Sequence, residues 1–383
     1  MIDRLLYKNM QDAIHKGKAV IILGARQVGK TTLLNQFQRE YTQKILLLDG
    51  DEPDIRSRLT NPTSTALKQL IGEYKMVLID EAQRIENIGI TLKLITDKLP
   101  DVQLIVTGSS SLDLANQINE PLTGRKFEYL MFPMSIKEML DYHGIIEEKR
   151  SLETRLIFGM YPDIITHPGN EKELLKQLTN SYLFKDILTY KEVRKPEMVE
   201  RLLVALALQV SSEVAYHEIG QTIGVDPVTV EKYIQILEKS FVVFRLSSYS
   251  RNLRNELKKS RKIYFYDNGI RNAIISNFSP MALRDDIGKL WENFLMSERQ
   301  KQNHYRTYYA NIYFWRTAQQ QEIDYIEEHD GQLSAFEFKW NPKKKHFPAT
   351  FLKAYPKATA SVIHPNNYLE WLNITGLQDV ENL

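Results

Sequence analysis

A glycine-rich string near the amino terminus constrains the fold of this chain more than any other feature. The string GARQVGKT, residues 24–31, follows an apolar run and precedes a stretch with helical spacing, and it fits the pattern Gly-x-x-x-x-Gly-Lys-Ser/Thr. In such a loop, backbone N–H groups wrap around phosphates and the helix amino terminus adds positive potential. The string therefore predicts a nucleotide-binding loop made of Gly24, Ala25, Arg26, Gln27, Val28, Gly29, Lys30, Thr31 and Thr32.

Two side chains of this loop have chemical roles that depend on their type. The Lys30 ammonium can reach the β- and γ-phosphates, and the Thr31 hydroxyl can bind Mg²⁺. We therefore expect ATP and Mg²⁺ as cofactors. The competing interpretation, a glycine loop without a ligand, fits poorly with the strand-loop-helix context.

Apolar runs alternate with helical stretches around the loop. The runs are apolar throughout, as strands are when helices cover both faces of a parallel sheet, and they span 19–24, 44–50, 75–81 and 102–109. Stretches with helical spacing lie between them, at 31–41 and 88–99. The expected fold class is α/β, with a parallel sheet covered by helices on both faces over residues 1–145.

An acidic pair follows the third apolar run. Asp80 is expected to contact Mg²⁺ through water, and Glu81 to polarise the attacking water, which predicts hydrolysis of ATP. One competing interpretation is that both carboxylates only cap the next helix. Another is a small-molecule kinase, although no acceptor site is apparent in the sequence.

Two later segments complete the expected nucleotide site. Thr107 and Ser109 end the fourth run, where either hydroxyl can contact the γ-phosphate or the attacking water. The competing interpretation is a turn without nucleotide contact. Arg125 follows Gly124 and is interpreted either as an arginine finger supplied to a neighbouring subunit or as an ordinary ion pair.

Residues 1–145 resemble an AAA-type ATPase of a branch found in many bacterial and archaeal proteins. The resemblance rests on the blocks GARQVGKTTL, LLLDGDEPDIRSRL, LIDEAQ, VTGSSS and LTGRKFEYLMFPMSIKEML in this order. The last block closes the ATPase domain in that branch, where a winged helix and a nuclease-like core commonly follow. AAA-type sites usually lie between subunits, so the resemblance implies a homo-oligomer.

The middle of the chain, residues 146–282, has helical spacing and contains a helix-turn-helix pattern. Asp226 can cap a second helix and Pro227 suits its first position. Its expected exposed face, which would read DNA, carries Thr229, Glu231, Lys232 and Gln235. A winged helix-turn-helix is therefore expected here, with docking of a protein as the competing role.

A basic loop follows this pattern. The loop contains seven basic residues and one acidic residue, Glu256. The basic residues are Arg245, Arg251, Arg254, Lys258, Lys259, Arg261 and Lys262. The formal net charge of the whole chain is only +2, so this loop and a second basic run at 339–347 are local features. Loop 245–262 predicts contact with DNA phosphates, although a charged run is often only a solvated face.

Residues 283–383 begin with a helix and return to short strands, as in an α+β unit. Glu292 lies on the helix, Asp324 on one strand, and Glu337 and Lys339 share one face of the next. Two carboxylates and a lysine at neighbouring strand positions can hold Mg²⁺, here through Asp324 and Glu337, and can activate water for phosphodiester cleavage. The order resembles the restriction-endonuclease-like PD-(D/E)xK core, with Ile323 in place of the proline.

These features favour Mg²⁺-dependent ATP hydrolysis coupled to DNA binding, with cleavage or remodelling of DNA left open. The alternative is a nucleotide-gated switch that binds a protein through a catalytically inert nuclease-like domain. The chain contains no cysteine, so thiolate chemistry is excluded and any metal must bind to other ligands. No apolar run approaches the roughly 20 residues of a membrane span, and no signal peptide is apparent, so a cytoplasmic location is expected.

Overall fold

The computed structural model describes residues 2–373 except 43, 110–117, 184–186, 188–192, 194, 250–260, 318, 342 and 344–346. The chain divides into two compact units. The first comprises Met1–Met134 with Lys239–Phe241, and the second comprises Ser135–Glu238 with Val242–Leu383. Each unit is described by itself below.

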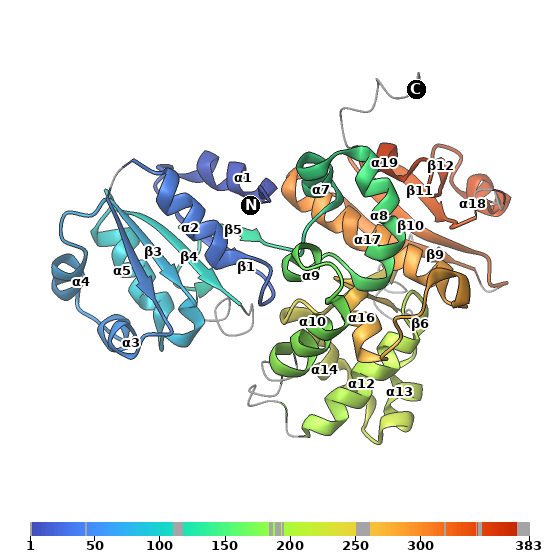
Figure 1. Ribbon diagram of the computed structural model, residues 1–383, viewed down its shortest axis with the longest axis horizontal. Coiled ribbons are helices and arrows are strands. Elements are labelled where there is room, and N and C mark those ends of the chain that lie inside the picture. The colour runs from blue at the N-terminus through green and yellow to red at the C-terminus, as the bar shows by residue number, and fades with distance from the viewer. Residues whose placement is uncertain are drawn as a thin grey trace. The chain divides into compact units, whose positions relative to one another are not determined.

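The first unit is built on a parallel five-stranded sheet with the order β2-β3-β4-β1-β5 (Figure 1). Its strands are β1 (Ala19–Leu23), β2 (Ile45–Asp49), β3 (Met76–Asp80), β4 (Gln103–Gly108) and β5 (Lys126–Leu130). The central strands β1, β3 and β4 are buried along their whole length. Because all strands run in the same direction, their carboxyl ends meet at one edge, where ligands bind in open α/β sheets.

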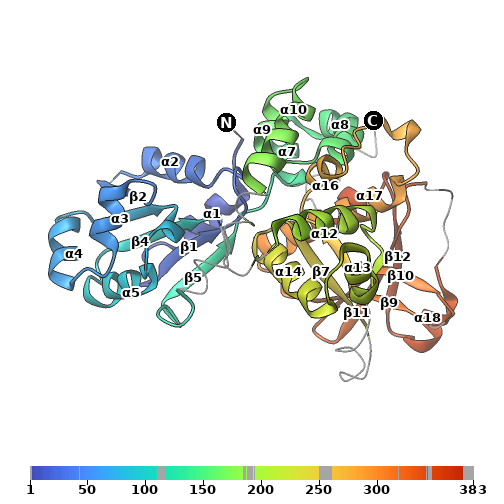
Figure 2. The ribbon, with the colours of Figure 1, turned by 90° about the horizontal axis from the view of Figure 1, so that it is seen from below.

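Helices cover both faces of this sheet, and Figures 1 and 2 show α2 on one face and α5 on the other. The helices are α1 (Leu5–Ala13), α2 (Lys30–Glu40), α3 (Pro53–Leu59), α4 (Ser64–Ile71) and α5 (Ile88–Lys98), with a 3-10 turn η1 (Ala82–Arg84) after β3. Helix α2 buries Leu33, Leu34 and Phe37, whose spacing forms one apolar stripe against the sheet. The prediction of an α/β fold with a parallel sheet is confirmed for this unit.

The second unit begins with helices. They are α7 (Ile136–His143), α8 (Ile145–Phe158), α9 (Pro162–Thr166), α10 (Glu171–Gln177), the π-helical segment η3 (Leu178–Leu183), α12 (Pro196–Leu208), α13 (Tyr216–Ile223) and α14 (Pro227–Lys239). Asp226 accepts a hydrogen bond from the backbone N–H of Thr229 at 3.0 Å, which caps α14 as expected. Later come α16 (Asn268–Ile274), a 3-10 turn η4 (Met281–Leu283), α17 (Ile287–Tyr305), α18 (Ala349–Ala354) and α19 (Tyr368–Trp371).

A mixed seven-stranded sheet with the order β12-β11-β10-β9-β7-β8-β6 runs through the second unit. Its strands are β6 (Glu213–Val214), β7 (Val243–Ser248), β8 (Arg261–Phe265), β9 (Asn311–Arg316), β10 (Glu322–His329), β11 (Gln332–Phe338) and β12 (Thr359–Ile363). Strands β7 and β9 pair in parallel, so the strands after α14 and the carboxyl-terminal strands form one sheet. Helix α17 packs against β8 and β11 of this sheet.

Candidate functional site

The glycine-rich loop lies between β1 and α2, at the carboxyl edge of the first sheet. Gly29 has φ 101°, a left-handed conformation that suits glycine, and it caps α2. At Gly24, a Cβ atom would lie 2.2 Å from the carbonyl oxygen of Met131, so only glycine fits there. The buried Arg4 side chain donates to the carbonyl oxygens of Val28 and Phe132 and so anchors the loop.

The lysine of the loop bonds back to the loop, and the threonine bonds to the end of β3. The Lys30 ammonium is buried and donates to the carbonyl oxygens of Gly24 at 2.9 Å and Ala25 at 2.8 Å. Thr31 donates from Oγ1 to Oδ2 of Asp80 at 2.7 Å. The expected pair of Mg²⁺ ligands is therefore together, and the residues present fit a nucleotide with its metal ion.

Residues of β4 join this cluster. Thr107 donates from its hydroxyl to Oδ1 of Asp80. Glu81 has φ 47°, a strained conformation for a residue with a side chain, and such strain clusters at functional sites. Thus the acidic pair, the loop and the tip of β4 lie together as expected.

Gln83 is a residue of this site whose role sequence reasoning did not assign. Its Nε2 donates to Oε2 of Glu81 at 2.5 Å and to Oγ of Ser109 at 2.8 Å. Its Oε1 accepts from the backbone N–H of Ser109 at 3.2 Å. The amide thus links the carboxylate expected to act on water with the end of β4. The position of a polar residue two places after Glu81 could have indicated this role. The turn η1, which directs the Gln83 side chain toward Glu81, was not predictable from the sequence.

Arg125 lies just before β5 and forms an ion pair in its own chain. Its Nε lies 2.6 Å from Oδ1 of Asp97, and both side chains are partly exposed. This geometry matches the ion-pair interpretation, while a role in a neighbouring subunit stays a prediction.

A second cluster of charged side chains lies on the large sheet of the second unit. Asp324 sits where the pairing of β9 with β10 shifts register, and its Oδ2 accepts from the backbone N–H of Phe338 at 2.8 Å. Lys339 Nζ lies 2.5 Å from Oε1 of Glu337 and 4.0 Å from Oδ2 of Asp324. Asp324, Glu337 and Lys339 therefore lie together on β10 and at the end of β11, as the sequence pattern predicted.

Lys262 from β8 enters this second cluster. Its side chain is 1% exposed, and Nζ lies 2.9 Å from Oε1 of Glu292, 2.5 Å from Oε1 of Glu322 and 3.8 Å from Oδ1 of Asp324. Tyr264 donates to Oε1 of Glu292 at 2.6 Å. Sequence reasoning missed Lys262 and Glu322 here, because Lys262 lies about 60 residues before the strand that it reaches.

Burial changes the acidity of this cluster. Burial, opposed by the Lys262 charge, raises the pKa of Glu292 to about 8. Burial and the neighbouring Asp324 raise the pKa of Glu337 to about 7. Oε2 of Glu337 is buried and has no hydrogen-bond partner among the described residues, so a bound cation would supply the partner that this oxygen lacks. Within the same part of the chain, no three His, Asp or Glu side chains already form a metal-binding group.

The expected DNA-contacting residues divide into two groups. Lys232 and Gln235 are exposed on α14, whereas Glu231 lies 3.7 Å from both Arg245 and Arg261. The expectation that Lys262 contacts DNA phosphate is wrong, because this side chain is buried against carboxylates. Four other basic residues of the loop lie outside the described residues, namely Arg251, Arg254, Lys258 and Lys259. Lys344 and Lys345 of the second basic run also lie outside them.

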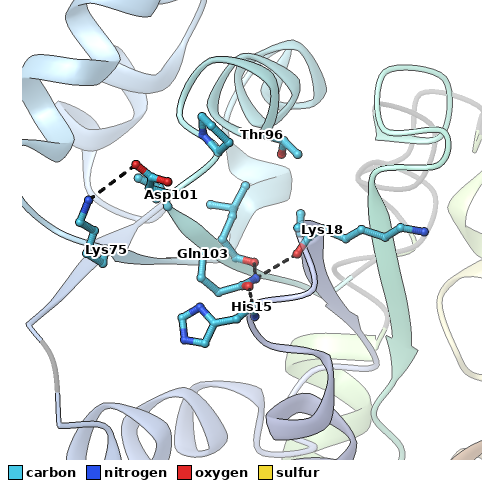
Figure 3. Close-up of a pocket in the computed structure, with 11 residues that line it drawn as sticks. His15, Lys18, Lys75, Thr96, Asp101 and Gln103 are labelled. Carbon is cyan, nitrogen blue, oxygen red and sulfur yellow. Dashed lines mark hydrogen bonds and ion pairs between the residues drawn. The ribbon is translucent and has the colours of Figure 1, made fainter.

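A cavity of about 440 Å³ lies at the opposite, amino-terminal edge of the first sheet (Figure 3). Gln103 crosses it and bonds to the backbone of His15 and Lys18, while Lys75 lies 3.9 Å from Asp101. None of the residues predicted for the nucleotide or metal sites lines this cavity. The cavity is therefore distinct from the candidate sites.

Three segments of the chain match known protein families. Residues 16–140 match the family described as AAA domain. Together with the loop geometry, the match supports an AAA-type P-loop ATPase domain. Residues 149–281 and 287–377 match two families described as domains of unknown function, DUF8612 and DUF4143. The matched segment contains the strands of the parallel sheet, and binding of ATP is what this family implies.

Similar chains occur in distant organisms. An uncharacterized protein of Mycobacterium tuberculosis is 26% identical over 347 residues, which are 86% of this chain and 72% of that protein. One of Methanocaldococcus jannaschii is 21% identical, over 84% of this chain and 75% of the relative. One of Haemophilus influenzae is 24% identical, over 67% of this chain and 68% of the relative.

Two solved structures have low similarity to the chain. The Drosophila ORC bound to AT-rich DNA and Cdc6 has a TM-score of 0.27 at 11% identity, over 70% of this chain and 88% of that one. A Signal Transduction ATPase with Numerous Domains from Pyrococcus horikoshii has a TM-score of 0.30 at 12% identity, over 79% of this chain and 45% of that one. Similarity this low does not bear on the fold of this chain.

Within the part of the chain that the structure describes, none of the helices combines the length and the apolar character that a membrane span requires.

Proposed function

We propose that this chain hydrolyses ATP with Mg²⁺ at the carboxyl edge of the first sheet and that its second unit binds DNA and cleaves it with a metal ion. The observation that carries the first part is the hydrogen bond of 2.7 Å between Thr31 and Asp80, next to the loop that holds Lys30. A hydroxyl from the first turn of the helix after the loop and a carboxylate at the end of a nearby strand are the usual protein ligands of nucleotide-bound Mg²⁺. The proposed domains are 1–145, 146–282 and 283–383.

In this proposal, each residue of the first site has its own role in ATP hydrolysis. The loop backbone and Lys30 hold the phosphates, and Thr31 and Asp80 hold Mg²⁺, which neutralises charge on the phosphates when bound. Glu81 orients and polarises the attacking water, and Gln83 holds Glu81 in place. Thr107 keeps Asp80 oriented. Arg125 would act on a neighbouring copy only after release from Asp97, so homo-oligomer formation is part of the proposal.

We assign DNA binding to a winged helix made of α12, α13, α14 and the strands β6, β8 and β7. The support is the order of these elements and the antiparallel pairing of β8 with both β6 and β7. Lys232 and Gln235 on the exposed face of α14 would contact DNA. This capped helix buries Val230, Ile234 and Leu237, so its opposite face is open to a ligand.

We assign phosphodiester cleavage to the cluster on β10 and β11. Asp324 and the open oxygen of Glu337 would hold Mg²⁺, which polarises the phosphate and activates water when bound. Lys339, beside both carboxylates, would stabilise the negative charge that develops on the phosphate.

A panel of single-stranded, duplex and forked DNA, assayed for stimulation of ATP hydrolysis and for Mg²⁺-dependent cleavage, tests the proposal. Lys30→Ala should abolish hydrolysis, and Glu337→Ala should abolish cleavage while hydrolysis continues. DNA that neither binds nor stimulates hydrolysis at low salt, where phosphate contacts are strongest, would refute the DNA part.

One observation favours a second candidate, a nucleotide-gated switch that binds a protein. Arg245 pairs with Glu238 at 2.6 Å, and both Arg245 and Arg261 lie 3.7 Å from Glu231, so part of the basic surface is neutralised within the chain. Under this alternative, ATP hydrolysis does not respond to DNA, and Glu337→Ala behaves as wild type.

A further inference from the structure

The cluster on the large sheet already contains a cation. The Lys262 ammonium is enclosed by Glu292, Glu322 and Asp324, all with an oxygen within 4 Å of Nζ, and it also lies over the Phe314 ring at 5.5 Å. Burial of an ammonium that is 1% exposed is costly unless carboxylates pair with it, as these three do. This ammonium is therefore a permanent part of the site.

The two oxygens of Asp324 face different neighbours. Oδ1 lies 3.8 Å from Lys262, whereas Oδ2 accepts from the N–H of Phe338 and lies 4.0 Å from Lys339. Glu337 gives one oxygen to Lys339 and leaves its buried Oε2 without a partner among the described residues. Among the described residues of this cluster, the carboxylate oxygen that is both buried and unpaired therefore belongs to Glu337.

Two-metal phosphodiesterases place their ions roughly 3.5–4 Å apart around shared carboxylates. The distances from Lys262 to Glu292, Glu322 and Asp324 put a positive charge where a second ion would need its ligands. We infer that this site takes a single divalent cation, on the Glu337 side of Asp324, and that the Lys262 ammonium fills the place of a second. The inference rests on the proposed metal-dependent function of the site.

Lys262 therefore acts as a positioning residue supplied by β8, a strand of the proposed winged helix. Its ammonium pairs with Glu292 on α17 and with Glu322 on β10. It therefore connects the proposed winged helix with the proposed nuclease-like domain at this site. Removal of its charge leaves three carboxylates that repel one another. Those carboxylates would then protonate or take up a divalent ion.

The test counts Mn²⁺ ions bound by the full chain without nucleotide, by titration with electron paramagnetic resonance of free Mn²⁺. An Asp80→Asn background removes the candidate metal ligand of the first unit. We expect one Mn²⁺ per chain, lost in Glu337→Gln. Two ions per chain would overturn the inference and leave the metal site intact, whereas no ion would overturn the metal-dependent function together with the inference.

Lys262→Met supplies the complementary measurement. We expect the number of Mn²⁺ ions bound per chain to rise from one to two in this variant. Its unfolding midpoint should be lower than that of wild type in EDTA, and addition of Mn²⁺ should raise it by more than it raises the wild-type midpoint. Lys301→Met is the matched control, because Lys301 is equally buried and pairs with Glu298 at 2.6 Å. It should lose stability without recovery in Mn²⁺. If folded Lys262→Met still binds one Mn²⁺ ion per chain, the inference is overturned. If this variant does not fold, the number of ions bound by the wild-type chain decides the inference.

Discussion

Thr31 and Asp80 are separated by 49 positions in sequence, yet the hydroxyl of one donates to the carboxylate of the other at 2.7 Å. The contact exists because β1 and β3 end at the same edge of a parallel sheet, with β4 between them. It brings the two expected metal ligands to the mouth of the loop that holds Lys30.

Loss of the Asp80 charge is expected to stop ATP hydrolysis. Asp80→Asn should lower kcat by about 100-fold or more, because the variant retains the shape but not the charge that holds Mg²⁺ and stabilises the transition state. Phosphate release at several Mg²⁺ concentrations measures this. Asp101→Asn, in the cavity at the other edge of the sheet, is the control and should keep full activity. Equal activity of both variants would contradict the assignment.

Gln83 is expected to affect turnover more than ATP binding. Gln83→Ala removes the amide that donates to Glu81 and Ser109, so kcat should fall by about tenfold while KM for ATP changes little. Gln83→Glu should be worse, because it places a second negative charge beside Glu81. Steady-state kinetics separate kcat from KM, and a change confined to KM would show that Gln83 acts on binding.

The pair Arg125 and Asp97 distinguishes an arginine finger from an ion pair. If Arg125 acts on a neighbouring subunit, Arg125→Ala should reduce hydrolysis by about 1000-fold in the oligomer, and Asp97→Ala should not. As an exposed ion pair, its loss should cost about 1 kcal/mol or less, and the two variants should behave alike. Hydrolysis measured over a range of protein concentrations compares them.

The stability of the second unit is expected to fall in acid through Glu327. Burial opposes ionisation of this carboxyl, but hydrogen bonds of 2.6 Å from Nε and Nη2 of Arg299 lower its pKa overall. A lowered pKa in the folded state means that the pair stabilises fully above the unfolded value of about 4.3, and that this contribution disappears as the pH falls through the folded pKa.

Glu327→Gln should therefore lower the unfolding free energy by about 3 kcal/mol at pH 7 and by much less near pH 3. All 4 tryptophans lie in the second unit, so their fluorescence in urea reports its unfolding. Glu328→Gln, on the neighbouring and less buried position, is the control. A difference from wild type that stays constant with pH would contradict the role of the Arg299 pair.

Lys232 is expected to contact a phosphate of bound DNA. Lys232→Gln should weaken binding several-fold at low salt and should reduce the slope of log affinity against log salt by about 1. Lys172→Gln, which removes an exposed lysine from α10, should leave the slope unchanged. Fluorescence anisotropy with labelled duplex DNA at several salt concentrations measures both slopes.

Local patterns predicted much of the first unit. The buried strands β1, β3 and β4 are apolar throughout, and the loop needs glycine at Gly29 for a local reason, its left-handed φ of 101°. The steric need for glycine at Gly24 comes from the distant Met131 and follows only from the tertiary structure. In the second unit, Asp226 and Pro227 predicted the start of α14 for equally local reasons. Strand β5 was not predicted, because its partly exposed residues do not form an apolar run.

Sequence alone therefore determined the nucleotide loop, the acidic pair after β3 and the pattern of Asp324, Glu337 and Lys339, since each depends on residue type and short spacing. Only the tertiary structure decided that Gln83 returns to Glu81, that Arg125 pairs with Asp97, and that Lys262 is buried among carboxylates. These contacts depend on strand order, turns and burial, which place side chains together regardless of their separation in sequence. A lysine in a basic run thereby becomes an internal cation, because the sheet directs it to the carboxylates and away from water.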